Sequence, residues 1–225
     1  MSFRKLVAFL FLVVISVTPL TASAAKYDEA ALKPVAYTMC YADEKEKAEG
    51  IDLNYFLVKD TVSVPVRHAI NREIINAVAD LCLEYKDAIE AKNCTIKITP
   101  EIRFNEAGIL SATFTSEGML KGAAHGFKAM KAVNFNYITG EEITVESLND
   151  LYKAAKLAPA YTKENINKLL KAKAKAGKLE LLQGFKGIDE LPDFYLTGKA
   201  MDIYAFFEPY EIAPYSSGIV ELLVD

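Results

Sequence analysis

Hydrophobic and polar residues alternate over several stretches of this chain, in the pattern typical of half-buried β-strands. The first two stretches cover residues 35–41 and 51–64, and the second is rich in leucine, tyrosine, phenylalanine and valine. A charged segment that ends at Gly50 separates them. The sequence therefore predicts two strands joined by a loop, and we expect the strands to pair.

The spacing of the apolar residues changes to three and four after Pro65, which predicts a long amphipathic helix. Proline is favoured in the first turn of a helix, and Ser63 is in position to cap it. We expect the helix to continue to about Ala91. Its apolar stripe consists of Val66, Ile70, Ile74, Val78, Leu81 or Cys82, Tyr85 and Ile89.

A β-hairpin is predicted next, packed against the long helix. Its first strand has apolar residues of one parity, and its return strand repeats the pattern after a turn over 105–108. Pro100 interrupts the first strand, so we expect an edge position or a bulge there. The inward-facing residues are Ile96, Ile98, Ile102 and Phe104 on the first strand and Leu110, Ala112 and Phe114 on the second.

The remaining elements are one strand, two short helices and three further strands. The strand has Phe127, Ala129, Val133, Phe135 and Tyr137 on one face. The helices are predicted over 145–157 and 162–176, with Thr162 as the cap of the second. The last strands are predicted over 194–196, 200–207 and 218–224.

The N-terminus has the features of a secretory signal peptide. Arg4 and Lys5 precede an apolar run over 6–20, and small residues follow it. We expect cleavage after Ala24, with Ala25 the next choice, so that residues 1–24 are removed and the protein is exported, to the periplasm or the medium. No membrane span is expected after cleavage. The alternative is an uncleaved membrane anchor.

Composition limits the partners. The chain has 225 residues and a formal net charge of −4, and a nucleic-acid-binding protein would carry a concentrated basic surface. We expect no nucleic-acid partner. Neither of the two histidines has ligand spacing with a cysteine, and no cofactor motif occurs. We therefore expect no metal site and no cofactor.

Export makes disulfides possible, and the chain has three cysteines. Cys82 is predicted near the end of the long helix, and Cys94 begins the next strand. Because the chain reverses between them, Cys82–Cys94 is the preferred pair. Cys40 is then free or pairs between chains.

Two segments are candidate functional sites. The first, residues 206–218, is a corner between two predicted strands, where Pro209 and Pro214 prevent regular strand pairing. Tyr210 and Tyr215 are candidate contact residues for a partner or a sugar, because tyrosine combines a rigid apolar face with a polar tip. Glu208 and Glu211 are a candidate catalytic acid pair, and a well-packed strand connection is the third interpretation.

The second segment is the small-residue loop 122–126, which contains His125. A loop histidine is suited to acid–base chemistry or partner contact, or it is incidental. No Gly-x-Ser-x-Gly motif and no zinc-protease motif accompanies it. The sequence therefore offers no nucleophile for His125 to activate.

These segments resemble a bacterial envelope domain, which forms the extracellular part of the lysozyme-sensing anti-sigma-V factor and precedes the catalytic domain of some peptidoglycan deacetylases. The residues that carry the resemblance are those of 193–197, 205–207 and the string Pro209-Tyr210-Glu211-Ile212-Ala213-Pro214-Tyr215, with Gly218, Gly122 to His125 and the motif Tyr137-x-x-Gly-Glu-Glu-Ile-Thr. It covers about 120–223. Residues 35–118 look like the β-α-β-β module that often precedes this domain.

The resemblance implies a signal peptide over 1–24, a deacetylase-type module over 26–118 and the envelope domain over 119–225. The family fold is α+β, with antiparallel strands, one long helix and two shorter ones. That agrees with the predicted order of elements. The chain shows neither the anti-sigma segment nor a deacetylase domain, so we expect a free-standing, exported binding module.

The expected partner is a lysozyme-like protein or peptidoglycan, and the expected activity is binding without catalysis. If the family's lysozyme-binding role applies, the contact residues are His125 and the corner residues Pro209, Tyr210, Glu211, Pro214 and Tyr215. Two alternatives remain: a small glycan hydrolase that uses Glu208 and Glu211, whose carboxyls would have to flank a sugar-sized cleft, and a lysozyme inhibitor.

Overall fold

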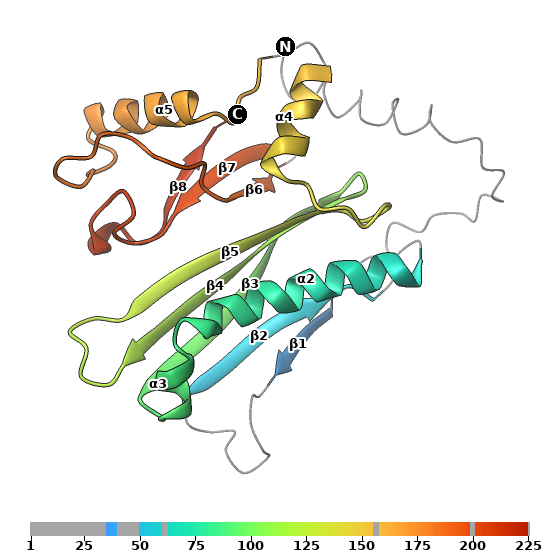
Figure 1. Cartoon of the computed structure of the whole chain (residues 1–225), viewed down its shortest axis with the longest axis vertical. Helices are drawn as coiled ribbons and strands as arrows, with labels where there is room; N and C mark the ends of the chain where they lie inside the picture. The colour runs from blue at the N-terminus through green and yellow to red at the C-terminus, as the bar shows by residue number, and fades with distance from the viewer. Residues whose placement is uncertain (1–34, 40–49, 60–62, 155–157, 199–200, 225) are drawn as a thin grey trace.

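The structure, a computed structural model, describes residues 35–39, 50–59, 63–154, 158–198 and 201–224. Figure 1 shows two sheets with helices outside them. The predicted signal peptide and Cys40 lie outside the described residues. The overall class is α+β, as the order of elements predicted.

The first sheet has five strands in the order β1-β2-β3-β4-β5. Adjacent strands of this sheet pair antiparallel, except β2 and β3, which pair in parallel through residues 51–53 and 96–98. The parallel pair arises because a helix crosses over between these strands and returns the chain in the same direction. The strands are β1 (Val35–Met39), β2 (Ile51–Leu57), β3 (Cys94–Glu106), β4 (Ile109–Leu120) and β5 (Phe127–Asn136).

The crossover helix is α2 (Val64–Leu83), and it lies along one face of the first sheet (Figure 1). Ser63 Oγ accepts a hydrogen bond from Val66 N, which confirms the predicted cap. The prediction of one helix to residue 91 is wrong. The helix α2 ends at Leu83, and a short helix α3 (Lys86–Glu90) follows. Tyr85 lies between the two helices, and its ring stacks on Phe127 with 3.7 Å between centroids.

The core beneath α2 follows the predicted parity. Leu110, Ala112 and Phe114 of β4 are buried against α2 together with Val133 and Phe135 of β5. Alternate residues of a strand point to opposite faces of its sheet. The other face of β4 and β5 must therefore be covered by something else or exposed to water.

The predicted irregularity in β3 is confirmed, because the register with β4 shifts between Ile102 and Phe104. One prediction for this strand is corrected by the shift. A one-residue bulge reverses the faces beyond it, so Phe104 packs in a second core, whereas Ile96 and Ile98 remain beneath α2. Ile102 precedes the shift and pairs with Ala112, but it is exposed and not buried as predicted.

The second sheet consists of three antiparallel strands, β6 (Phe194–Thr197), β7 (Asp202–Phe207) and β8 (Val220–Leu223). Helices α4 (Val145–Ala154) and α5 (Lys163–Lys175) share its core. Thr162 Oγ1 accepts from Asn165 N and caps α5, as predicted. The fully buried Tyr161 ties the start of α5 to the chain before β6, because its hydroxyl donates to Pro192 O at 2.8 Å.

The two sheets join through polar groups on the face of β4 and β5 that is turned away from α2. Ser111 Oγ donates to Asn134 Oδ1 at 2.7 Å, and Asn134 Nδ2 donates to Phe194 O at 2.8 Å. Leu196 N donates to Ser111 Oγ at 2.8 Å. The edge of β6 is therefore hydrogen-bonded to the face of the first sheet. The module boundary that was predicted after residue 118 falls inside β4.

In the described part of the chain, no helix is both long enough and apolar enough to cross a lipid bilayer.

Candidate functional site

The two candidate segments meet in space. The loop between β4 and β5 brings His125 against the corner between β7 and β8. His125 Nε2 lies 3.2 Å from the hydroxyl of Tyr210, and the His125 ring stacks on Tyr215 with 4.2 Å between centroids. The rings of Tyr210 and Tyr215 are 5.8 Å apart. We call His125, Tyr210 and Tyr215 the corner cluster.

The hydrogen bonds assign the tautomer of His125. Its Nδ1 lies 2.8 Å from Gly126 O, and a carbonyl oxygen only accepts, so Nδ1 carries the hydrogen. In the neutral ring Nε2 is then an acceptor, and the hydroxyl of Tyr210 donates to it. The geometry thus orients both side chains of the cluster relative to each other.

Tyr210 is held in an unusual backbone conformation. Its φ is +70°, in the left-handed region, which costs a non-glycine residue roughly 1–2 kcal/mol. The turn is closed by hydrogen bonds from Tyr210 N to Ala213 O and from Glu211 N to Glu208 O. Such strain persists only where the surrounding structure fixes it, and here it turns the Tyr210 ring outward, where the residue is 55% exposed.

The second half of the corner positions Tyr215. Pro214, with φ −58°, precedes a single 3₁₀ turn over Tyr215–Ser217, and Gly218 ends the turn at φ +63°. The preset φ of proline and the freedom of glycine suit these two positions. Pro209 lies two residues after the end of β7, beyond the last paired residue, Phe207.

Glu208 fastens the corner to the first sheet. Its Oε1 accepts a hydrogen bond from Met130 N on β5 at 3.1 Å. Burial raises the pKa of Glu208 above the ordinary glutamate value, and the hydrogen bond from Met130 offsets part of this shift. This carboxylate therefore has a structural partner 78 residues away in the sequence.

Glu211 stabilises the turn through a hydrogen bond to the backbone of the same turn. Its Oε2 accepts from Glu208 N at 2.9 Å, and burial raises the pKa of Glu211, with the charge of Glu208 adding to the increase. Both carboxylates of the predicted acid pair thus accept backbone hydrogen bonds. The geometry gives them the role of holding the corner.

The small residues beside His125 allow the close approach of the two segments. A Cβ atom on Gly126 would lie 2.6 Å from Gly118 O and 3.6 Å from the hydroxyl of Tyr215. The first distance is a clash with backbone. Glycine at position 126 is therefore needed where the loop passes β4 and the corner.

One aromatic pair near this loop was not identified as part of a site from the sequence. Phe127 follows His125 by two residues, and its ring stacks on Tyr85. The sequence did contain a signal for these two residues. The apolar pattern placed Tyr85 on the stripe of the long helix and Phe127 on the apolar face of a strand. The contact between the two stripes depends on how α2 lies on the sheet, which periodicity does not specify.

The predicted disulfide is not formed in the structure, where Cys82 and Cys94 are both free thiols. Burial raises the pKa of each thiol, and the charge of Cys94 raises the pKa of Cys82 further. Their pairing under oxidising conditions stays a prediction. Among the described residues, no three histidine, cysteine, aspartate or glutamate side chains are grouped to hold a metal ion.

Comparison with known sequences gives one family match. A family described as "Protein of unknown function (DUF3298)" matches residues 149–225. This range includes the corner but not His125. No curated protein matches the chain.

Solved structures with a similar fold include two DUF3298 proteins. One is a DUF3298 family member from Bacteroides fragilis, with a TM-score of 0.53, 14% identity, and coverage of 86% of this chain and 89% of that one. The other is a DUF3298 family protein from Pseudomonas aeruginosa, with a TM-score of 0.50, 14% identity, and coverage of 86% and 88%. At this identity the likeness establishes the fold alone. The C-terminal part of the chain, from within α4 onward, is thus similar to DUF3298, and nearly the whole chain has the fold of its solved members.

Proposed function

We propose that this protein is an exported, non-enzymatic binding module of the bacterial envelope, and that the corner cluster is its contact surface. The observation that supports the proposal is the meeting of His125 with Tyr210 and Tyr215. Two loops that are far apart in the sequence converge to present aromatic rings with polar tips at the surface. Such side chains dominate the binding energy of many protein interfaces.

The cluster is also preorganised for contact. The stacked ring of Tyr215, the hydrogen bond from Tyr210 to His125 and the closed turn at Tyr210 fix the rings before a partner arrives. A partner then binds without a large loss of side-chain entropy. Pro209, Glu211 and Pro214 contribute by holding the turn.

The partner that we propose is a lysozyme-like protein, as the resemblance to the anti-sigma-V domain implies. An exposed tyrosine, Tyr210, beside the half-buried ring of Tyr215 suits contact with a protein surface. Peptidoglycan is the other expected ligand. A hydrolase based on Glu208 and Glu211 has less support, because both carboxylates are used in backbone hydrogen bonds.

The experiment is calorimetric titration of residues 25–225 with a c-type lysozyme and with solubilised peptidoglycan. Tyr210→Ala, Tyr215→Ala and His125→Ala are measured beside Ile102→Ala, which removes an exposed apolar side chain outside the cluster. We expect lysozyme binding that weakens more than about tenfold, or 1.4 kcal/mol, in Tyr210→Ala and Tyr215→Ala. Ile102→Ala should bind as the unsubstituted protein does.

Three outcomes separate the alternatives. Binding to peptidoglycan alone would replace the proposed partner with a glycan. Loss of lysozyme activity in the complex would identify an inhibitor. Binding to neither ligand, or equal binding by the cluster variants and Ile102→Ala, would contradict the proposal.

A further inference from the structure

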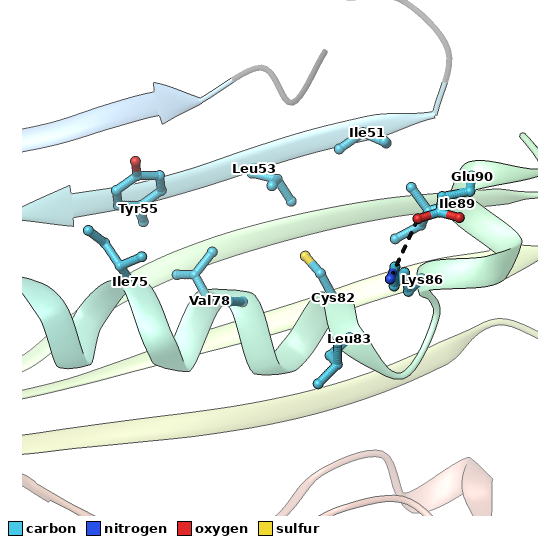
Figure 2. Close-up of a pocket in the computed structure, with 11 residues that line it drawn as sticks. Ile51, Leu53, Tyr55, Ile75, Val78, Cys82, Leu83, Lys86, Ile89 and Glu90 are labelled. Carbon is cyan, nitrogen blue, oxygen red and sulfur yellow. Dashed lines mark ion pairs between the residues drawn. The ribbon is translucent and has the colours of Figure 1, made fainter.

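An apolar groove lies between strand β2 and helix α2 (Figure 2), and no residue of the corner cluster lines it. In the first sheet, β3 and β4 separate β2 from β5, the strand to which Glu208 fastens the corner. The groove has a volume of about 470 Å³, which is within the usual range of small-molecule sites. It therefore qualifies as a second candidate site that is independent of the proposed partner contact.

Helix α2 has two adjacent apolar stripes, and only one of them is buried against the sheet. The buried stripe includes Ile74 and Leu81. The second stripe includes Ile75, Cys82 and Leu83, and it forms one wall of the groove. Ile75 is 47% exposed and Leu83 is 66% exposed. Apolar residues on a surface are usually scattered singly, whereas a contiguous apolar patch marks a candidate binding site.

The opposite wall is the side-chain face of β2, formed by Ile51, Leu53 and Tyr55 (Figure 2). The backbone hydrogen-bonding groups of a strand lie in the plane of its sheet, and those of a helix bond within the helix. Neither wall therefore offers backbone partners to a ligand. A bound peptide strand would bury N–H and C=O groups without partners, at roughly 1–3 kcal/mol each, whereas a hydrocarbon chain has none to satisfy.

The dimensions of the groove suit a single extended chain. Eight residues separate Ile75 from Leu83, which corresponds to about 12 Å along a helix. Four residues separate Ile51 from Tyr55, which corresponds to about 13 Å along a strand. The two walls thus match in length, as one extended alkyl chain lying between them requires.

Charge is confined to the end of the groove at α3. Of the residues that line the groove, Lys86 and Glu90 are the charged ones, and Lys86 Nζ lies 3.9 Å from Glu90 Oε1 (Figure 2). Both side chains are more than 60% exposed, and an exposed pair at this distance contributes little stability. The ammonium of Lys86 can therefore exchange Glu90 for the head group of a ligand.

We propose that this groove binds a single-chain amphiphile with an anionic head group, of the fatty-acid class. The alkyl chain lies between β2 and α2, and the carboxylate lies at Lys86. This assignment rests on the groove alone and does not depend on the function of the corner cluster.

The test is calorimetric titration of residues 25–225 with dodecanoate below its micelle concentration. We expect saturable binding that Ala79→Phe weakens at least tenfold. Ala79 lines the groove and is exposed, so a phenyl ring at this position would occupy part of the groove. We expect Lys86→Glu to weaken binding at least fivefold. Lys168→Glu, which reverses an exposed charge on α5, is the matched control and should leave binding unchanged.

Two further measurements make the outcome decisive. Thermal unfolding of each variant establishes that it is folded, and dodecyltrimethylammonium replaces the anionic head group with a cationic one. The proposal is overturned if dodecanoate does not bind, if folded Ala79→Phe binds it equally, or if the cationic probe binds as tightly. Binding to anionic phospholipid vesicles without binding to dodecanoate would also overturn it.

Discussion

The backbone N–H of Leu196 donates a 2.8 Å hydrogen bond to Ser111 Oγ, across 85 positions of the sequence. Ser111 is fully buried, and its hydroxyl in turn donates to Asn134. The edge of the second sheet thus meets the face of the first through a satisfied polar network, and the corner cluster depends on this arrangement because its two loops belong to different sheets.

Two buried serines of β4 test the value of this network. Ser111→Ala removes the acceptor of Leu196 N, and we expect it to lower the free energy of unfolding by about 1–3 kcal/mol, because a buried donor loses its partner. Ser116 is the matched control, since it is fully buried and its Oγ has no partner. Ser116→Ala should be neutral or stabilising in urea denaturation. A larger loss in Ser116→Ala than in Ser111→Ala would contradict this account.

Tyr210 allows stability and binding to be separated. Glycine adopts the left-handed conformation without the steric cost that tyrosine has at φ +70°. We expect Tyr210→Gly to keep the free energy of unfolding within about 1 kcal/mol of the original value. We also expect it to lose binding at the corner cluster. Tyr210→Ala keeps the backbone strain and should be the less stable of the two in thermal unfolding.

The carboxyl of Glu208 predicts a pH dependence of stability. Its pKa in the folded protein is raised, chiefly by burial, from an ordinary value of 4.5. The folded state therefore binds the proton more tightly than the unfolded state does. This contribution to stability is fully present below pH 4.5 and is lost as the pH rises through the folded pKa.

Glu208→Gln removes this titration while keeping an oxygen that accepts from Met130 N. We expect the stability of the variant relative to the original protein to improve as the pH rises from 4.5 to neutral. Denaturation at a series of pH values measures the difference. A constant difference between the two proteins across this range would show that the folded state does not raise the pKa of Glu208.

The predicted pairing of Cys82 with Cys94 is tested under oxidising conditions. In a Cys40→Ser variant, we expect a disulfide in a glutathione redox buffer, identified by mass spectrometry of unreduced peptides. Closing a short loop should raise the free energy of unfolding by up to about 3 kcal/mol. Thiols that both remain open to alkylation in that buffer would show that the free pair seen in the structure is the stable state.

Local sequence was sufficient for much of the fold. The alternation in β4 and β5 identified the residues beneath α2, because a strand with one apolar face can bury only that face. Ser63 and Thr162 marked the starts of α2 and α5 through their capping hydroxyls. The prolines and glycine of 206–218 predicted the corner, since φ restrictions act within a few residues.

Element boundaries and buried faces were harder to predict where contacts between distant segments decide them. The pattern in α2 continued smoothly to residue 91, yet the chain turns at Tyr85, where the ring stacks on Phe127. The parity of β3 placed Phe104 with Ile98, and the bulge moved it to the other core. In both cases a contact with a distant strand outweighs the local period.

The sequence by itself determined most of the strands and helices, most of their buried faces and the candidate residues of the corner. Only the tertiary structure decided that β2 and β3 run parallel, that the polar face of Ser111 and Asn134 is buried against β6, and that His125 meets Tyr210 and Tyr215. The physical reason is the distance along the sequence over which each kind of interaction acts. Backbone preferences and hydrophobic periodicity act over a few residues, whereas the partners of buried polar groups and surface loops are set by how whole sheets pack.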